Sequence, residues 1–222
     1  MKRLLAQIVG LLYENQCSIC NETCSNSIVC KFCENEFVIR GDNYIKHLDK
    51  VKSYVWGMYE GKLRQGIINL KNGNKKLAPY FGKKIAELWE KFPEDIKFGN
   101  SLVIPIPSHK KRIKERGFCQ TSLIANEFAK TLSLGILNES IVRRKETRFM
   151  NTLQSVEERK NNIKDAFEIN DRNSIYKCVE NIFIVDDIVT SGSTISELAS
   201  TISTYCPNVN LIGVAVASGD KY

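Results

Sequence analysis

The stretch IFIVDDIVTSGSTI, residues 182–195, decides the fold of this chain and most of its chemistry. It begins with an almost unbroken apolar run, which is typical of a strand buried on both faces of a parallel sheet. Two adjacent carboxylates, Asp186 and Asp187, follow the run directly. A loop of small residues comes next, and apolar residues then recur at helical spacing through residues 195–205. The stretch therefore predicts a strand, a loop and a helix, with an acid pair at the strand end.

The loop between the acid pair and the helix has the composition of a phosphate-binding turn. Successive backbone N–H groups at a helix N-terminus form a positive concavity suited to a phosphate monoester. Gly192 can take a positive φ and lets phosphate oxygens approach closely. The hydroxyl donors around it are Thr190, Ser191, Ser193 and Thr194. The two carboxylates can accept hydrogen bonds from vicinal hydroxyls, as on a ribose, and can lie near a divalent cation.

The alternative interpretation of the same stretch is a buried strand, solvated aspartates and a capped helix. Ser193 or Thr194 would then be an ordinary helix cap. That interpretation leaves an adjacent acid pair at a strand end unexplained, so we favour a ligand site. The turn is not a Walker A loop, because Ser193 and not a lysine follows Gly192.

Short apolar runs alternate with amphipathic stretches on both sides of this loop. SLVIPIP (101–107) and VNLIGVAVA (209–217) have strand character, and TSLIANEFAKTL (121–132) has helical spacing. Such alternation predicts an α/β fold with a parallel sheet. Ligands of such sheets bind beyond the carboxyl ends of strands, here after residues 103–107 and after Val185. Upstream, the apolar-aromatic run SYVWGMYEG (53–61) leads into residues with helical spacing.

The 182–195 stretch resembles the signature of type I phosphoribosyltransferases, which bind 5-phosphoribosyl-1-pyrophosphate (PRPP). That signature has four apolar residues, two acids, two apolar residues and a T-[ST]-G-x-T loop, and every position fits. The resemblance implies the parallel-sheet type I phosphoribosyltransferase fold and PRPP binding with Mg²⁺. It implies that Asp186 and Asp187 hold the ribose hydroxyls while residues 190–194 wrap the 5′-phosphate. The PRPP-binding residues expected are Asp186, Asp187, Ile188, Val189, Thr190, Ser191, Gly192, Ser193, Thr194, Pro107, Ser108, His109 and Lys110.

A second stretch, VIPIPSHKKRIKERGFCQ (103–120), places basic residues after a strand that ends in prolines. These residues are Lys110, Lys111, Arg112, Lys114 and Arg116. Alone, such a run is most often a solvated helix start. Next to a PRPP loop it fits the neutralisation of pyrophosphate, for which Mg²⁺ and arginine or lysine are suited.

This second stretch resembles the ComF/GntX family pattern VP-V-P…R…RGFNQ…LA. The matching residues are Pro105, Pro107, Arg112, Arg116, Gly117, Phe118 and Gln120, whereas Cys119 replaces the usual asparagine. YEGKLRQGIINLK (59–71) and SVEERKNNIKDAF (155–167) resemble two further elements of that family, and Asn151 departs from a frequent glutamine. The resemblance implies a Mg²⁺-dependent phosphoribosyltransferase with an unreadable acceptor, associated with natural competence and DNA uptake. Its expected catalytic residues are Asp186, Asp187, Arg112 and Arg116, and a hood from parts of residues 40–95 together with the four-cysteine head would recognise the acceptor.

Five of the eight cysteines fall within residues 17–33. Cys17-x2-Cys20 and Cys30-x2-Cys33 are two paired knuckles that can close a tetrahedral thiolate shell around Zn²⁺. Cys24 offers an alternative ligand, and a redox pair or iron–sulfur cluster is the competing chemistry. The ComF family shows the same four-cysteine head. We therefore expect an N-terminal helix and zinc finger in residues 1–45 and a phosphoribosyltransferase-type domain in residues 46–222.

The chain carries 32 Lys+Arg against 25 Asp+Glu, a formal charge of +7, which permits phosphate-bearing partners without identifying one. The resemblance to the ComF family also implies an alternative function, a non-catalytic adaptor of DNA uptake that binds single-stranded DNA beside a helicase-like ATPase. Its groove would use the basic stretches 75–84, 110–116 and 143–145. Candidate stacking residues are Tyr54, Trp56, Tyr59 and Phe118.

The first residues, MKRLLAQIVGLLY (1–13), have some features of a signal peptide. Gln7 interrupts the apolar run and no small-x-small cleavage site precedes Cys17, so an amphipathic helix is the better interpretation. No stretch approaches the ~20 apolar residues that span a bilayer. The sequence is thus expected to belong to a cytoplasmic protein with no membrane span.

Overall fold

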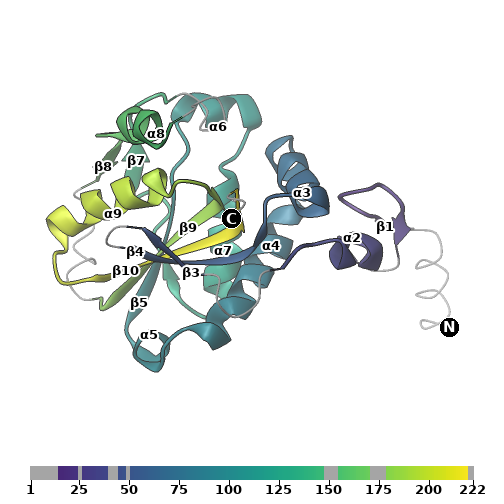
Figure 1. Cartoon of the computed structure of the whole chain (residues 1–222), viewed down its shortest axis with the longest axis horizontal. Coiled ribbons are helices and arrows are strands. Elements are labelled where there is room, and N and C mark those ends of the chain that lie inside the picture. Colours follow the sequence, from purple (N-terminus) through teal and green to yellow (C-terminus); the bar gives the residue numbers. More distant parts are fainter. Residues whose placement is uncertain are drawn as a thin grey trace, which may run out of the picture.

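The structure is a computed structural model that describes residues 15–24, 27–39, 45–48, 51–147, 155–170 and 179–219. Its centre is a six-stranded sheet with the order β3-β4-β10-β9-β5-β6 (Figure 1). The strands are β3 Ile45–Leu48, β4 Val51–Met58, β10 Asn210–Ser218, β9 Asn181–Val189, β5 Ser101–Pro105 and β6 Gly135–Ile136. β3 pairs with β4 antiparallel, and the other neighbouring pairs are parallel. The predicted α/β class with a parallel sheet is confirmed.

Apolar side chains cover both faces of the sheet, because successive residues of a strand point to opposite sides. In β9, Phe183 and Val185 join one core with buried residues of α3, α4 and α7. Ile182 and Ile184 join a second core with buried residues of α8 and α9. The helices span α3 Gly61–Lys71, α4 Leu77–Ala86, α7 Gln120–Thr131, α8 Val156–Ile163 and α9 Ser193–Tyr205. A strand covered on both faces needs no polar side, which explains the unbroken apolar run.

Strand β9 runs through the acid pair and ends at Val189, beyond the end at Val185 that the apolar run suggests. Its pairing with β10 continues, with Ala215 opposite Asp186 and Ser218 opposite Val189. β5 stops earlier, with Pro105 opposite Val185. The acid pair is therefore held in regular strand geometry by β10, while its β5 side faces the loop that follows β5.

Strand β4 comes from the apolar-aromatic run that the sequence analysis left without an assigned structure. Tyr54, Val55 and Trp56 are all buried, so the run has no polar alternation that would mark it as a strand. An unbroken apolar run of this length fits a strand or a buried helix equally well. The helical spacing after it is confirmed, since Leu63, Ile67 and Leu70 are fully buried in α3.

Smaller elements lie around the central sheet (Figure 1). The N-terminal elements are β1 Asn15–Gln16, β2 Thr23–Cys24 and α2 Lys31–Asn35. The others are η1 Glu87–Lys91, α5 Glu94–Phe98, α6 Lys110–Arg116, and the antiparallel pair β7 Ile141–Arg143 and β8 Phe167–Ile169. Figure 1 shows α6, α8, β7 and β8 close together at the top of the molecule, and α2 and β1 beside α3 and α4 at its right end.

The cysteine-rich segment packs directly on α3 and α4. Its buried residues Cys17, Ile19 and Cys33 belong to the same apolar core as these helices. The Asn69 side-chain amide in α3 donates to the Ser18 carbonyl over 2.9 Å. In α2, Glu34 accepts from the Tyr80 hydroxyl at 3.0 Å and pairs with the Lys84 ammonium at 2.8 Å. Apolar contact and polar bonds together fix the segment to the helices.

Some sequence predictions lie outside the described residues. These are the amphipathic helix expected in residues 1–13, the departure at Asn151 and the scattered Cys178. Within the ranges that the structure describes, no helix has both the length and the hydropathy to cross a membrane.

The close contact of α4 with α7 generates a stability prediction at Gly82. A Cβ at this position would lie 2.6 Å from the Ile124 carbonyl oxygen and 3.1 Å from the Phe128 amide nitrogen. Backbone atoms cannot rotate away, so we expect Gly82→Ala to lower the free energy of unfolding by about 1–3 kcal/mol in urea denaturation. The exposed neighbour Lys83 is the control, and Lys83→Ala should stay within about 0.5 kcal/mol of the wild type. Equal effects of the two substitutions would contradict the packing argument.

Candidate functional site

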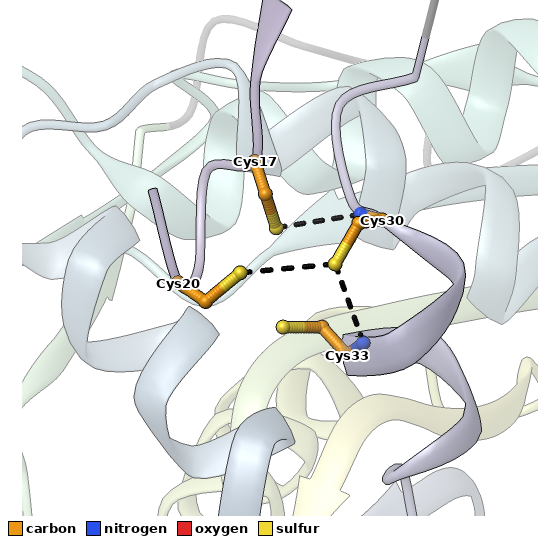
Figure 2. A group of neighbouring side chains, drawn as sticks. All are labelled: Cys17, Cys20, Cys30 and Cys33. Carbon is orange, nitrogen blue, oxygen red and sulfur yellow. Dashed lines mark hydrogen bonds between the residues drawn. The ribbon is translucent and has the colours of Figure 1, made fainter. Parts of the chain in front are cut away.

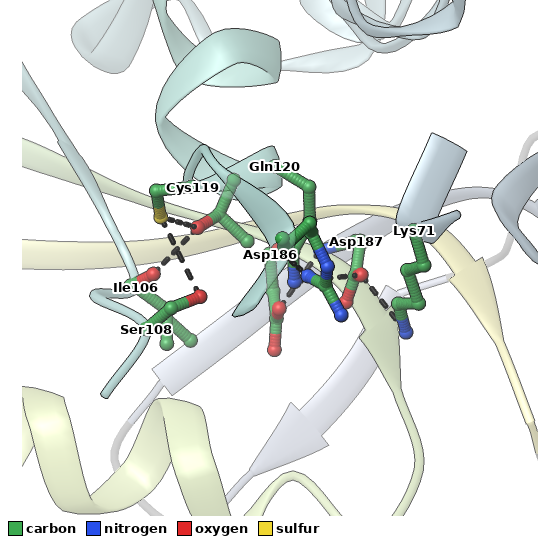
Figure 3. A network of polar contacts seen from close by, with 9 residues as sticks. Lys71, Ile106, Ser108, Cys119, Gln120, Asp186 and Asp187 are labelled. Carbon is green, nitrogen blue, oxygen red and sulfur yellow. Dashed lines mark hydrogen bonds and ion pairs between the residues drawn. The ribbon is translucent and has the colours of Figure 1, made fainter. Parts of the chain in front are cut away.

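The acid pair lies near the carboxyl end of β9, where two helices deliver polar side chains to it (Figure 3). The Lys71 ammonium, from the last residue of α3, forms an ion pair with Asp187 Oδ2 at 3.0 Å. The Gln120 amide, from the first residue of α7, donates to the same oxygen at 3.3 Å. Gln120 in turn accepts a hydrogen bond from the Arg116 guanidinium. A chain of polar contacts thus links the basic helix α6 to Asp187.

The two acids have opposite protonation tendencies although they are neighbours. Burial first, and then repulsion from Asp187, raise the pKa of Asp186 well above its ordinary value. Burial would also raise the pKa of Asp187, but the charge and hydrogen bond of Lys71 outweigh it and hold that pKa below its ordinary value. One oxygen of Asp186 accepts the Asp187 backbone N–H at 2.8 Å. The surroundings of the pair therefore favour ionisation of Asp187 over ionisation of Asp186.

The predicted phosphate turn follows β9 and begins α9. Gly192 has φ +74° and precedes the first helical residue, Ser193, so the turn uses the left-handed backbone conformation that glycine favours. The hydroxyls of Ser191 and Ser193 are 2.8 Å apart, and the Lys46 ammonium from β3 donates to the Thr190 carbonyl oxygen. Helix α9 spans 13 residues, so its N-terminus presents unpaired N–H groups and the positive end of a dipole to the turn. The geometry suits a phosphate group.

The other predicted site residues divide between strand, turn and the loop after β5. Ile188 and Val189 belong to β9 itself, and Thr194 to the first turn of α9. Pro107 and Ser108 form the loop, and His109 caps α6 by accepting the Lys111 backbone N–H on Nδ1 at 3.3 Å. Lys110 is exposed at the start of α6. The loop lies beyond the end of β5, on the side of β9 that β5 leaves open.

Cys119 lies in a hydroxyl cluster beside this loop. Its sulfur is 3.5 Å from the Ser108 hydroxyl and 3.1 Å from the Thr121 hydroxyl, which itself donates to the Ile106 carbonyl at 2.6 Å. Burial would raise the pKa of Cys119, but its hydrogen bonds with Ser122, Thr121 and Ser108 lower it below its ordinary value. The sulfur therefore fills a polar position that a hydrogen-bonding side chain such as asparagine could also fill.

The sequence analysis did not assign three residues that the structure brings to the acid pair. Lys71 and Gln120 are contacts of Asp187. Arg143 is buried and close enough to Asp186 for that charge to act on its pKa. All three lie in stretches that the sequence analysis quoted for other reasons. Only their position next to the carboxyl end of β9 shows that they belong to the site. Contacts between α3, α7 and β9 span more than sixty positions in sequence, so spacing along the chain carries no signal for them.

The basic stretches proposed for a nucleic-acid groove are only partly exposed. In 143–145, Arg143 is buried, Arg144 pairs with Glu168, and the Lys145 ammonium donates to the Lys164 carbonyl at 3.2 Å. Tyr54, Trp56 and Phe118 are buried, so none of them can stack on a base without leaving the core. Exposed lysines remain on α6, on α4 and just before α4; they are Lys110, Lys111, Lys114, Lys83, Lys75 and Lys76.

A second candidate site is the group of four cysteines in the N-terminal segment (Figure 2). The sulfurs of Cys17, Cys20, Cys30 and Cys33 all lie within 4.8 Å of one another. The Cys20 and Cys30 sulfurs are 3.7 Å apart, close to the ~3.8 Å edge of a tetrahedron with arms of ~2.3 Å. Cys24 bonds the Ser27 carbonyl instead, at 3.2 Å. The predicted set of paired knuckles is thus the set that comes together, with Cys24 outside it.

The environment of these thiols favours a bound cation. Burial would raise the pKa of Cys17, but backbone N–H groups of Cys30, Cys20 and Ile19 lower it to about 6. Burial and the neighbouring thiols raise the pKa of Cys33. Four thiolates in one small volume repel one another, and a divalent metal ion removes that repulsion by binding all of them. The donor set and spacing fit a structural metal site.

The chain is thus a parallel α/β protein that combines an acid pair, a glycine turn at the start of α9 and a cysteine cluster. No family model matches it. Competence protein F of Haemophilus influenzae is 30% identical over 97 residues, 44% of this chain and 42% of that protein. DNA utilization protein YhgH of Escherichia coli K12 is 31% identical over 97 residues, covering 44% of this chain and 40% of that protein. These two homologues confirm the resemblance to the ComF family, over less than half the length of each protein.

Among solved structures, the chain is similar to the xanthine-guanine-hypoxanthine phosphoribosyltransferase of Helicobacter pylori. The TM-score is 0.40 with 11% sequence identity, over 68% of this chain and 87% of that one.

The cysteine cluster predicts a metal-dependent stability of the whole chain. Because Cys17 and Cys33 share an apolar core with α3 and α4, we expect Cys33→Ser to lose the bound metal and to lower the melting temperature. Elemental analysis of the purified protein should find about one metal ion per chain in the wild type. Cys24→Ser is the matched control and should keep both the metal and the melting temperature. Retention of metal by Cys33→Ser would show that the cluster is not the binding site.

Because its pKa is raised, Asp186 should make the folded protein less stable as pH rises. Between the unfolded value of about 3.9 and the raised folded value, the folded protein binds more protons than the unfolded chain. The free energy of unfolding therefore decreases as pH rises through that window. Asp186→Asn removes this titration, so its melting temperature should exceed that of the wild type at pH 8, and the gap should narrow at pH 5.

Asp95→Asn, which changes an exposed carboxyl in α5, is the control for this titration. Its melting temperature should follow that of the wild type across the range. If the gap between Asp186→Asn and the wild type is the same at pH 5 and pH 8, the pKa of Asp186 is not raised.

Proposed function

We propose that this chain binds PRPP at the acid pair and the phosphate turn, and that it transfers the 5-phosphoribosyl group in a Mg²⁺-dependent reaction. The observation that carries the proposal is the continuity of β9, which leads Asp186 and Asp187 directly into the Gly192 turn at the N-terminus of α9. The carboxylates that could accept from a diol and the N–H groups that could donate to a phosphate thus lie within a few residues of one another along the chain. A ribose 5-phosphate moiety carries both a diol and a phosphate.

In the proposed reaction, Asp187 accepts hydrogen bonds from the ribose hydroxyls and Asp186 completes the diol contact. The bond between the anomeric carbon and the pyrophosphate oxygen breaks, and the electron pair leaves with pyrophosphate. A bond from the acceptor nucleophile to the anomeric carbon replaces it, and the acceptor's proton is lost to solvent. The residues of the site would hold the substrate in position and neutralise the charge of the pyrophosphate, rather than act as acid or base.

Basic residues at the edge of the site would neutralise the negative charge of the leaving pyrophosphate. Arg116 is connected to Asp187 through Gln120, and Arg112 lies half-buried on the same helix. Mg²⁺ prefers oxygen ligands, which the ionised Asp187 carboxylate and a pyrophosphate both offer, and when bound it would neutralise pyrophosphate charge. The loop Pro107–Lys110 would then line the pyrophosphate side of the site.

We propose zinc as the metal of the cysteine cluster. An all-thiolate set of four with tetrahedral spacing is the usual structural zinc site. Reduced thiols of this kind persist in the cytoplasm, which is the proposed place of action. The cluster and α3 together would form part of the hood that recognises the acceptor.

We propose a role in DNA uptake, because the homologues are named for competence and DNA utilization. The second candidate is a non-catalytic adaptor that binds single-stranded DNA beside a helicase-like ATPase. The exposed lysines of α6 and α4 favour it. The two functions differ in salt dependence, because a phosphate-tracking groove weakens steeply as salt increases.

PRPP binding is tested by thermal shift of the full chain with PRPP, with and without Mg²⁺. A ligand that binds only the folded state at a hundred times its Kd stabilises by about 2.7 kcal/mol, a shift of about 5–10 °C at this size. We expect that shift in the wild type with Mg²⁺ and its loss in Asp187→Ala. Asp95→Ala is the surface control and should retain it. Release of pyrophosphate from PRPP in the presence of candidate bases or amines then tests transfer. A wild type with no shift at any PRPP concentration would refute the proposed function.

A further inference from the structure

Asp187 receives its counterion from the chain itself (Figure 3). The Lys71 ammonium is 3.0 Å from Asp187 Oδ2, and the Gln120 amide donates to the same oxygen at 3.3 Å. An ionised carboxylate accepts at about four lone-pair sites, two on each oxygen, so these two donors fill Oδ2. Asp187 also has a side-chain hydrogen bond with Asp186. A metal ion bound at Oδ2 would therefore have to displace Lys71 or Gln120.

The backbone of Lys71 is fixed by the residues that precede it in α3. Leu70 is fully buried in the core that α3 shares with the cysteine segment, and the Asn69 amide donates to the Ser18 carbonyl at 2.9 Å. Lys71 is the last residue of α3, where the negative end of the helix dipole favours a cation. The ammonium is therefore held against Asp187 by a packed helix, and no ligand is needed to bring it there.

Lys71 is also the main compensation for the charge of Asp187. Asp187 is 5% exposed, and a buried carboxylate that loses its counterion is strongly destabilising. Arg112 is shared with other acids: burial lowers its pKa, and the charge of Glu146 opposes this more strongly than the charge of Asp187 does. The Lys71 ammonium, in contrast, is in direct contact with Asp187. A divalent ion at the same oxygen would meet the repulsion of this ammonium.

We propose that Lys71 is a positioning residue that takes the place of a metal ion at the acid pair. It keeps Asp187 charged and oriented before any ligand binds. A divalent ion then enters only together with an anionic ligand, because the oxygens of that ligand supply the coordination that Asp187 does not. This inference rests on the proposed function for the identity of the ligand, PRPP. It also means that a sugar phosphate without a diphosphate needs no divalent ion to contact the pair.

The first test measures the binding of Mn²⁺ alone to the full chain by electron paramagnetic resonance, in which bound Mn²⁺ loses the signal of the free ion. The wild type and Asp187→Asn should bind equal amounts, because Lys71 keeps the ion away from the acid pair. Lys71→Met, which keeps a similar length without the charge, should bind Mn²⁺ at least about tenfold more tightly. Lys71→Met/Asp187→Asn should return to the wild-type level. Lys84→Met is the matched control and should bind as the wild type does, since Lys84 is 23% exposed and also forms an ion pair, with Glu34 at 2.8 Å.

Two outcomes of this test overturn the proposal. If Asp187→Asn binds less Mn²⁺ than the wild type, the acid pair holds the ion while Lys71 is in place. If Lys71→Met binds Mn²⁺ no more tightly than Lys84→Met, Lys71 is not what keeps the ion away. Melting curves show whether each variant is folded. The comparison of the wild type with Asp187→Asn involves no change at Lys71, so it decides the question even if Lys71→Met does not fold.

The second test is titration calorimetry with ribose 5-phosphate, in buffer freed of divalent ions by a chelating resin and again with Mg²⁺. The wild type should bind equally well in both buffers. Lys71→Met should weaken binding about tenfold to a hundredfold, which is the usual effect of losing hydrogen bonds to a charged group, and Lys71→Arg should restore most of it. Inorganic phosphate, which has no diol for the acids, should bind Lys71→Met and the wild type alike. Equal weakening of both ligands would assign Lys71 a structural role and overturn the proposal.

The two tests together separate this inference from the proposed function. If the wild type does not bind ribose 5-phosphate in either buffer, PRPP binding at the acid pair fails, and the Mn²⁺ comparison alone decides the role of Lys71. If the wild type binds ribose 5-phosphate only with Mg²⁺, the proposed function stands and the role of Lys71 as a substitute for the metal fails.

Discussion

The unequal length of two neighbouring strand pairings governs the geometry of this protein. β9 and β10 remain paired to Val189 and Ser218, whereas β5 leaves β9 at Val185. Beyond that point β9 is anchored on one side only, and its acids are held in place with their other flank open. An acid pair on a free loop would lack this rigidity. The helices and loops around the acid pair lie against the part of β9 that β5 leaves unpaired.

The alternation of side chains along β9 separates the two acids and gives them different surroundings. Asp187 points to the face of α3 and α7, where Lys71 and Gln120 keep it ionised. Asp186 points to the other face, near Arg143, and burial raises its pKa. A motif of two identical residues therefore supplies two groups in different surroundings. Asp187 is the more readily ionised of the two, so it is the better acceptor of hydrogen bonds from hydroxyls.

Much of the fold was predictable because its signals are local. The apolar runs at 182–185 and 209–217 and the helical spacing in 195–205 all correspond to elements of the structure. The paired cysteines were predictable for the same reason, since C-x2-C spacing specifies the ligands of one turn. β4 was not assigned, because burial on both faces removes the alternation that identifies a strand. Lys71, Gln120 and Arg143 were missed because they reach the acid pair from elements distant in sequence, and only tertiary packing joins them.

Helix α3 touches both candidate sites. Asn69 binds the Ser18 carbonyl in the cysteine segment, and two residues later Lys71 reaches Asp187. A helix is stiff over so short a distance, so a displacement of the cysteine segment is transmitted to the ammonium group with little loss. A single turn of backbone therefore joins the cysteine cluster to the counterion of Asp187, so a substitution in either site acts on a helix that also holds the other.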